Sequence, residues 1–139
     1  MSIKIMRVCS KKEHQICLSI RRKVFIEEQG ISEAIEMDDD RIDATNFFAS
    51  LNDEYVGTAR YQSTSYGIKL ERFAVLRPYR NLGIGKALVK FMLSTLHSDD
   101  EIYLHAQESV VEFYTPLGFK KIGERFFEAD IPHWKMIKR

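Results

Sequence analysis

The residues with the clearest chemical potential form a glycine-bearing segment that follows an apolar run. The apolar run is Phe73-Ala74-Val75-Leu76, and the segment is Arg80-Asn81-Leu82-Gly83-Ile84-Gly85. The two glycines let a ligand approach the backbone closely, and the first N–H groups of a helix have no partner within the helix. Because the helix dipole and the Arg80 cation both favour negative charge, the segment predicts a phosphate-binding turn between a strand and a helix.

Two familiar phosphate-binding motifs do not fit this segment. A P-loop has its first glycine where Arg80 stands, and a serine or threonine where Ala87 stands. A dinucleotide-binding fingerprint has a third glycine where Leu88 stands, and it follows a strand–helix–strand unit that is not predicted here. The remaining pattern is Arg-x-x-Gly-x-Gly, followed by Lys86 in the first helical turn.

The elements that position this turn are predicted from hydrophobic periodicity and turn residues. Strands are predicted at 3–9, 45–51, 55–63, 68–76, 101–107, 119–131 and 133–138. Helices are predicted from Ser10 to about Gln29, at 82–96 and at 109–117, with a helical turn inside the acidic loop 31–43. The order β-α-α-β-β-β-α-β-α-β-β predicts a mixed α/β fold, with a mostly antiparallel sheet of six to seven strands and about four flanking helices.

Composition and charge limit the classes of function. A chain of 139 residues fits one domain, so 1–139 is predicted to be a single domain. A net charge of +1, from 21 basic and 20 acidic residues, predicts no binding to nucleic acid or to a membrane surface. No apolar stretch has the length of a membrane span or the pattern of a signal peptide. Cys9 and Cys17 are expected on different elements, which predicts a reduced, cytoplasmic protein without a disulfide. No cysteine or histidine has zinc-site spacing, so no metal is expected.

Several motifs resemble the GNAT acyltransferase superfamily. The pattern over 73–88 is similar to its pyrophosphate loop, and Phe113-Tyr114 with Leu117-Gly118-Phe119 is similar to its acceptor-side motif. The segments that resemble the ElaA-like (YjcF-like) branch are 24–29, 56–60, 104–107 and 127–133, so the resemblance covers nearly the whole chain. Two residues depart from the pattern. Asn81 replaces a common glycine, which we expect to stiffen the loop, and Asp130 replaces another, which we expect to alter the last turn.

The resemblance implies an N-acetyltransferase in which an amine attacks the thioester of acetyl-CoA directly, within a ternary complex. The acceptor would be a primary amine of a small molecule or a protein, and the chain would act as a monomer or homodimer. The strand would part from its neighbour at Phe73, Ala74 and Val75, which would then pair with the pantetheine arm like an added strand. The residues expected at the diphosphate of coenzyme A are Arg80, Asn81, Leu82, Gly83, Ile84, Gly85 and Lys86.

The resemblance also implies a general acid at Tyr114. A phenol of ordinary pKa, about 10, stays protonated at neutral pH and can donate a proton to the leaving sulfur. The carboxylate that acts as a base in histone-acetylating relatives would fall at Lys69, so this base does not carry over. The open candidates for the base are Glu71, His105, Glu28 and Glu27, a water relay, or an amine that arrives neutral.

Two further questions stay open at the level of sequence. The acidic run Asp38-Asp39-Asp40 is either a solvated loop or an acidic lip for a cationic amine. The main rival function is a coenzyme A-binding sensor of the same fold with lost or weak transfer activity, which the intact Tyr114 argues against. A structural domain that binds no ligand is disfavoured by the spacing from Arg80 to Gly85.

Overall fold

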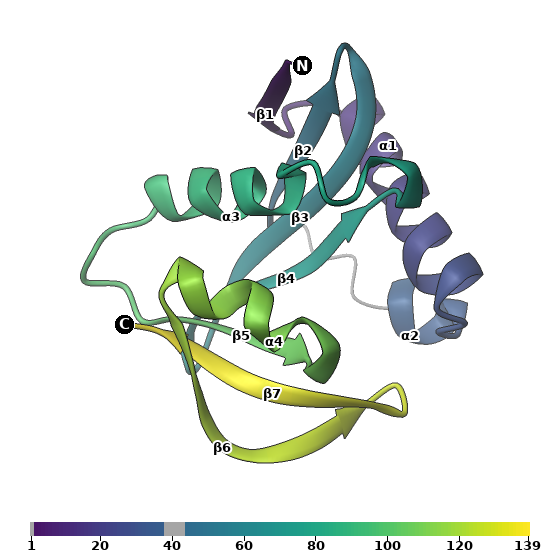
Figure 1. Cartoon of the computed structure of the whole chain (residues 1–139). Helices are drawn as coiled ribbons and strands as arrows, with labels where there is room; N and C mark the ends of the chain where they lie inside the picture. The colour runs from purple at the N-terminus through teal and green to yellow at the C-terminus, as the bar shows by residue number, and fades with distance from the viewer. Residues whose placement is uncertain (1, 38–43) are drawn as a thin grey trace.

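The computed structural model describes residues 2–37 and 44–139 (Figure 1). They form the mixed α/β fold that the sequence predicts, built on one seven-stranded sheet in the order β1-β2-β3-β4-β5-β7-β6. All neighbouring strands are antiparallel except β4 and β5, which are parallel. The strands are β1 (Ile3–Arg7), β2 (Thr45–Leu51), β3 (Glu54–Thr64), β4 (Gly67–Val75), β5 (Ile102–Gln107), β6 (Phe119–Glu128) and β7 (Ile131–Lys138).

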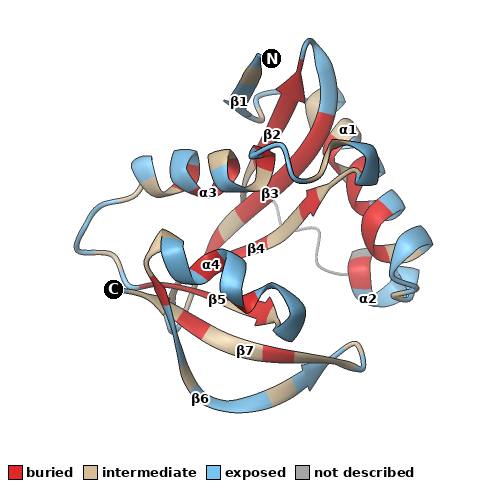
Figure 2. Ribbon diagram, viewed as in Figure 1, coloured by how far each residue is buried: buried red, intermediate tan, exposed pale blue. Residues whose placement is uncertain are grey.

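Helices cover both faces of this sheet. The helices are α1 (Lys11–Arg21), α2 (Glu33–Met37), α3 (Ile84–Ser94) and α4 (Val111–Tyr114), the last flanked by 3-10 turns at Glu108–Val110 and Thr115–Leu117. The main core lies between the sheet and the side of α3 and α4, and a smaller cluster lies between α1 and Ala74. Figure 2 shows buried residues concentrated along β2 and β3. None of the helices in the described ranges is both long and apolar enough to cross a membrane.

The first helix begins as predicted but does not continue as one α-helix to Gln29. The Ser10 hydroxyl accepts the Glu13 N–H at 3.1 Å, and the Glu13 carboxylate accepts the Cys9 N–H at 2.7 Å. After Arg21 the chain continues as a π-helical segment (Arg22–Glu28). The prediction of a single α-helix was wrong there. The wider winding depends on packing, because it buries Val24 and Phe25 of the segment beside Ala74.

The turn between the last two strands comes earlier than predicted: the first strand ends three residues sooner, and the second begins two residues sooner. β6 ends at Glu128, and Ile131 already belongs to β7. Ala129 and Asp130 form the turn, with φ of 49° and 61°. Positive φ at both central residues is typical of a type I′ hairpin turn, in which aspartate is common. Asp130 therefore suits the turn that it occupies.

The two parallel strands at the centre of the sheet are paired over a short stretch only. Ile68, Lys69 and Leu70 of β4 pair with residues 102–104 of β5. From Glu71 onwards β4 remains paired with β3, and from His105 onwards β5 remains paired with β7, but the two strands are no longer paired with each other. This opening, which the family resemblance implies beside Phe73, positions the site described next.

Candidate functional site

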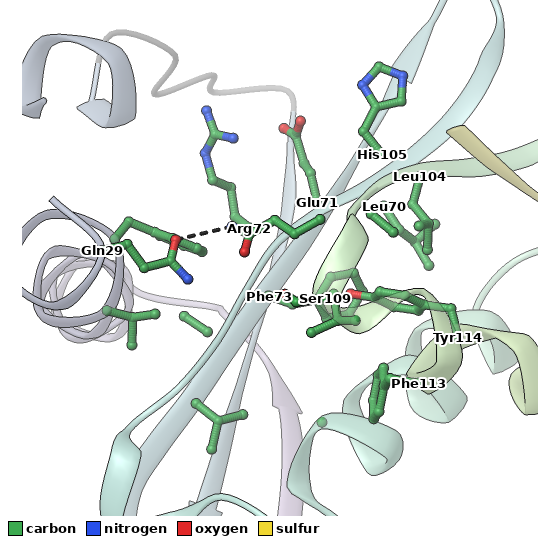
Figure 3. A pocket seen from close by; sticks show the side chains of 18 of the residues that line it. Gln29, Leu70, Glu71, Arg72, Phe73, Leu104, His105, Ser109, Phe113 and Tyr114 are labelled. Carbon is green, nitrogen blue, oxygen red and sulfur yellow. Dashed lines mark hydrogen bonds between the residues drawn. The ribbon is translucent and has the colours of Figure 1, made fainter. Parts of the chain in front are cut away.

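One cavity of about 920 Å³ extends across the opening between β4 and β5. Its lining comes from the π-helical segment, α2, β4, the turn before α3, the start of α3, β5, α4 and the β6–β7 hairpin. Figure 3 shows Glu71, Arg72 and His105 pointing towards one end of this cavity, with Phe113 and Tyr114 towards the other. The predicted phosphate turn therefore shares one space with three of the predicted catalytic side chains, those of Tyr114, Glu71 and His105.

The glycine turn has the backbone conformation that a close ligand contact needs. Gly83 precedes α3 with φ of 88°, and a Cβ built on it would meet no atom within 4 Å. Asn81 has φ of 64°, a conformation that asparagine tolerates better than most side chains. A Cβ on Gly85 would lie 3.2 Å from the Phe113 ring, so this glycine also lets α4 approach α3.

Most of the residues predicted for the donor side line the cavity. They are Phe73, Ala74, Val75, Arg80, Asn81, Gly83, Ile84, Gly85 and Lys86. Leu82 is an exposed side chain outside that lining. The N–H groups of Ile84, Gly85 and Lys86 lie in the first turn of α3, where an α-helix supplies no acceptor.

Arg80 is held in place by the chain itself. Its Nη1 and Nη2 donate to the two carboxylate oxygens of Glu28 at 2.6 and 2.7 Å, and its Nε donates to the Val75 carbonyl at 2.8 Å. The hydrogen bonds from Arg80 hold the pKa of Glu28 below its usual value. The guanidinium thus joins the π-helical segment to the end of β4 and fixes the start of the glycine turn.

A second contact connects the residue after the π-helical segment to β5. Gln107 at the end of β5 donates through Nε2 to the Gln29 side-chain oxygen at 3.0 Å. Both side chains line the cavity. The π-helical segment is therefore connected to both edges of the opening, to β4 through Arg80 and to β5 through Gln29.

Tyr114 lies on the α4 side of the opening. Its ring packs against Phe113, Phe73 and Phe119, with centroid distances of 5.0, 5.7 and 6.0 Å. Burial raises the pKa of its phenol well above the ordinary value. Since no hydrogen bond to its hydroxyl is found within residues 2–37 and 44–139, the hydroxyl is free to meet a ligand in the cavity that it lines.

The carboxylates predicted as base candidates are engaged in ion pairs or lie outside the cavity. Glu71 is buried and accepts hydrogen bonds from Arg60 and Gln62, both at 2.7 Å. Burial alone would raise its pKa, but the charges of Arg60, Arg72 and Lys69 lower the pKa below its usual value. Glu27 and Glu28 do not contribute to the cavity lining, and Glu28 is paired with Arg80.

His105 is the first β5 residue beyond the last pair with β4, and it lines the cavity. Its Nδ1 lies 2.8 Å from the Glu128 carboxylate, and Nε2 of His133 lies 3.8 Å from the other oxygen of that carboxylate. The hydrogen bond with His105 lowers the pKa of Glu128, although partial burial acts in the opposite direction. The sequence did not indicate Glu128 as a partner, because β7 separates β5 from β6 in the sheet. The only signal was its place in a motif shared with the resembled branch.

A β-bulge places Arg72 at the same end of the cavity as His105. Leu70 packs in the core on the α3 side, and Phe73, three positions further along the strand, packs against Tyr114 on that same side. Strict alternation would put them on opposite faces, so the chain needs one extra residue, which Arg72 supplies with φ of 58°. Sequence reasoning missed this residue as a member of the site.

Comparisons with known proteins agree with the fold. Residues 10–139 match the family model described as an acetyltransferase (GNAT) domain. The chain is 34% identical to an uncharacterised protein of Bacillus subtilis, YyaT, over 96% of this chain and 94% of that one. It is 30% identical to the uncharacterised N-acetyltransferase YjcF of the same organism, over 94% and 97% of the two chains. The crystal structure of Escherichia coli ElaA superposes with a TM-score of 0.87 at 27% identity, over 99% and 100% of the two chains. The chain therefore belongs to the GNAT acetyltransferase family, in the branch of YjcF and ElaA.

Proposed function

We propose that this protein is an N-acetyltransferase that transfers an acetyl group from acetyl-CoA to a primary amine in a ternary complex. The observation that carries the proposal is the opening between β4 and β5, which connects the glycine turn at Gly83 with Tyr114 and His105 in one cavity. The diphosphate fits the first turn of α3. The pantetheine arm then pairs with the free edge of β4 beside Phe73, and the thioester reaches the opening.

In this proposal Tyr114 donates the proton that the leaving thiolate takes up. A raised pKa keeps its phenol protonated at neutral pH, and its free hydroxyl faces the cavity. The oxyanion that forms from the carbonyl needs an N–H donor, which the unpaired edge of β4 beside Phe73 supplies.

His105 is our choice among the base candidates. With Glu128 holding a proton on Nδ1, the Nε2 atom of His105 is left as an acceptor for a proton of the incoming amine. Glu71 and Glu28 are less suited, because arginine partners lower their pKa values. Arginine also binds both oxygens of Glu28 and the Oε2 atom of Glu71. His105 reaches the cavity from the α1 side of the sheet, and Tyr114 reaches it from the α4 side. The amine and the leaving sulfur are therefore served from opposite sides of the opening.

The proposal is tested by thermal unfolding and by thiol release. Acetyl-CoA at millimolar concentration should raise the unfolding temperature, and one member of an amine panel should release free coenzyme A thiol above background. The panel spans polyamines, aminosugars, amino acids and peptides. A clear thermal shift without thiol release from any amine would contradict transfer and would leave a coenzyme A-binding sensor. The absence of any thermal shift would contradict both functions.

A further inference from the structure

We infer that the amine acceptor of this site carries a carboxylate, and that Arg72 binds it. The inference rests on the proposed N-acetyltransferase function and names the class of its acceptor. It starts from the position of Arg72 in β4, beyond the last pair between β4 and β5 and beside the cavity. Figure 3 shows its guanidinium on the same side of the strand as the Glu71 carboxylate and the His105 ring.

The guanidinium of Arg72 has no hydrogen-bond partner among the residues that the structure describes. Its Nε is buried, and the nearest acceptor is the Oε2 atom of Glu36 at 3.4 Å, which is an ion-pair contact without hydrogen-bond geometry. The other oxygen of that carboxylate, Oε1, accepts a hydrogen bond from Nε of Arg21 at 2.7 Å. A buried donor without a partner costs free energy, so an arginine left in this state beside a cavity points to an acceptor supplied by a ligand.

The backbone at Arg72 supports a role beyond packing. A residue other than glycine with φ of 58° is strained, and such conformations cluster where a side chain must be aimed at a ligand. Without the bulge, Arg72 would follow the alternation of the strand onto the opposite face. The strained residue is therefore what turns the guanidinium towards the end of the cavity that His105 also lines.

Among residues 2–37 and 44–139, the local charge also favours an anionic group; the acidic run Asp38-Asp39-Asp40 lies outside the described residues. On the β4 side of the cavity the described ion pairs contain four cations and two carboxylates, which leaves two positive charges in excess. The cations are Arg21, Arg60, Lys69 and Arg72, and the carboxylates are Glu36 and Glu71. Across the opening, the Glu128 carboxylate is already bound to His105.

A carboxylate fits this place better than a phosphate does. A guanidinium presents a planar pair of N–H donors that matches the two oxygens of a carboxylate. The Glu36 and Glu71 carboxylates beside Arg72 would repel a dianion more strongly than a single negative charge. Glu71 and His105 are the next residues of the two strands after the paired Leu70 and Leu104. An acceptor whose carboxylate is bound by Arg72 therefore points its amine towards the opening. An amino acid carries both of these groups.

The test compares L-amino acids with their carboxamides as acceptors, with acetyl-CoA as donor. The wild-type protein should acetylate the best amino acid with kcat/KM at least about tenfold above that of its amide, because a charged hydrogen-bonded pair is lost in the amide. The α-ammonium group of a carboxamide loses its proton more easily than that of the free amino acid. A preference for the amino acid therefore cannot come from easier deprotonation of its amine. In Arg72→Gln the KM for the amino acid should rise by at least about tenfold, while the KM for the amide and for acetyl-CoA stay unchanged. Arg72→Lys, which keeps the charge without the planar fork, should be intermediate.

The matched control is Arg125→Gln, which removes an equally charged side chain from β6 outside the cavity and should change no parameter. A second readout is independent of turnover: L-amino acids should stabilise the protein saturated with coenzyme A against heat, their amides should not, and Arg72→Gln should abolish the difference. Selective binding without thiol release would overturn the proposed transfer but keep the carboxylate site. Four results would overturn the inference while leaving the proposed transfer intact. They are equal use of amides, a preference for polyamines, an unchanged preference in Arg72→Gln, and no selective binding of any carboxylate.

Discussion

Gly83 precedes α3 in a backbone conformation that other residues adopt only under strain. Its φ of 88° and the open space in front of it leave the first N–H groups of the helix accessible from the cavity. Asn81 reaches a similar φ of 64°. Its side chain is among the few that tolerate this region, so the local conformation of the turn is kept although a common glycine is missing.

At this scale, Gly83→Glu should abolish acetyl-CoA binding, because a bulky anion would fill the place of the diphosphate. The left-handed backbone should also cost about 1 kcal/mol of stability for any non-glycine residue. The matched control is Gly123→Glu on β6, where φ is 72° and the space is equally open. Calorimetric titration should find binding lost only in the first variant, with similar unfolding temperatures for both. Retained binding in Gly83→Glu would remove the glycine turn from the donor site.

Tyr114→Phe tests the proposed acid without changing the packing of the ring. Because the hydroxyl makes no hydrogen bond within the described ranges, its removal leaves the aromatic contacts with Phe73 and Phe119 intact. Turnover should fall by on the order of 100-fold, as expected for the loss of a general acid. Acetyl-CoA affinity, measured by titration, should stay nearly unchanged. Turnover equal to that of the wild type would exclude Tyr114 from the proton transfer.

Among the elements, β4 carries most of the site, and its local features differ in how far the sequence predicts them. The glycine turn follows from residue types at fixed spacing, and the opening beside Phe73 was expected only from the family resemblance. The bulge at Arg72 was not predicted, because it follows from which side of the sheet Leu70 and Phe73 pack on. A local pattern does not contain that information.

Two other features escaped prediction for related reasons. The change from α- to π-helical winding after Arg21 depends on packing against Ala74, whereas helix propensity alone predicts a continuous α-helix. The contact of His105 with Glu128 depends on the strand order β5-β7-β6 and on the register of both pairs. The periodicity that predicts a strand does not determine its register against a strand that is not adjacent in sequence.

The ion pair between Arg60 on β3 and Glu71 on β4 should make the free energy of unfolding depend on pH. The folded pKa of Glu71 lies below the ordinary 4.5, so its contribution is complete above that value and is lost as the pH falls through the lowered pKa. Glu71→Gln should reduce the free energy of unfolding at pH 7 by roughly 3 kcal/mol, since it breaks a buried ion pair with Arg60. The difference from the wild type should shrink as the pH is lowered below 4.5.

Urea unfolding at pH 7 and at several pH values below 4.5 measures this difference. Glu33→Gln is the control, because its carboxylate forms a similar arginine pair on the exposed surface and should matter little at any pH. A Glu71→Gln difference that stays constant over this range would mean that the carboxylate charge does not stabilise the fold.

At the scale of the whole molecule, the sheet consists of two parts with a narrow connection. The strands β1 to β4 form one part, and β5, β7 and β6 form the other. Three residue pairs, at Ile68, Lys69 and Leu70, connect them. The Gln29–Gln107 hydrogen bond adds a side-chain bridge on the α1 side of the opening.

A ligand that pairs with the free edge of β4 should therefore protect backbone amides on both sides of the opening. We expect acetyl-CoA to slow hydrogen exchange in residues 71–75 and 105–107, in addition to 82–86 at the glycine turn. Exchange in β1 and β2, which lie at the far edge of the sheet, should not change and serves as the internal control. Protection confined to 82–86 would show that the pantetheine arm does not enter the opening.

The narrow connection between the two parts of the sheet also bears on which acyl groups can be transferred. The angle between β4 and β5 sets how wide the opening is, and three residue pairs, the helices on either face and the Gln29–Gln107 hydrogen bond help to hold that angle. Room for a longer acyl chain would require a wider angle between β4 and β5. Replacing a single side chain with a smaller one would not provide that room. Changes in donor chain length should therefore arise from substitutions in the packing under α3 and in the bridge at Gln29 and Gln107, at a distance from the reacting atoms.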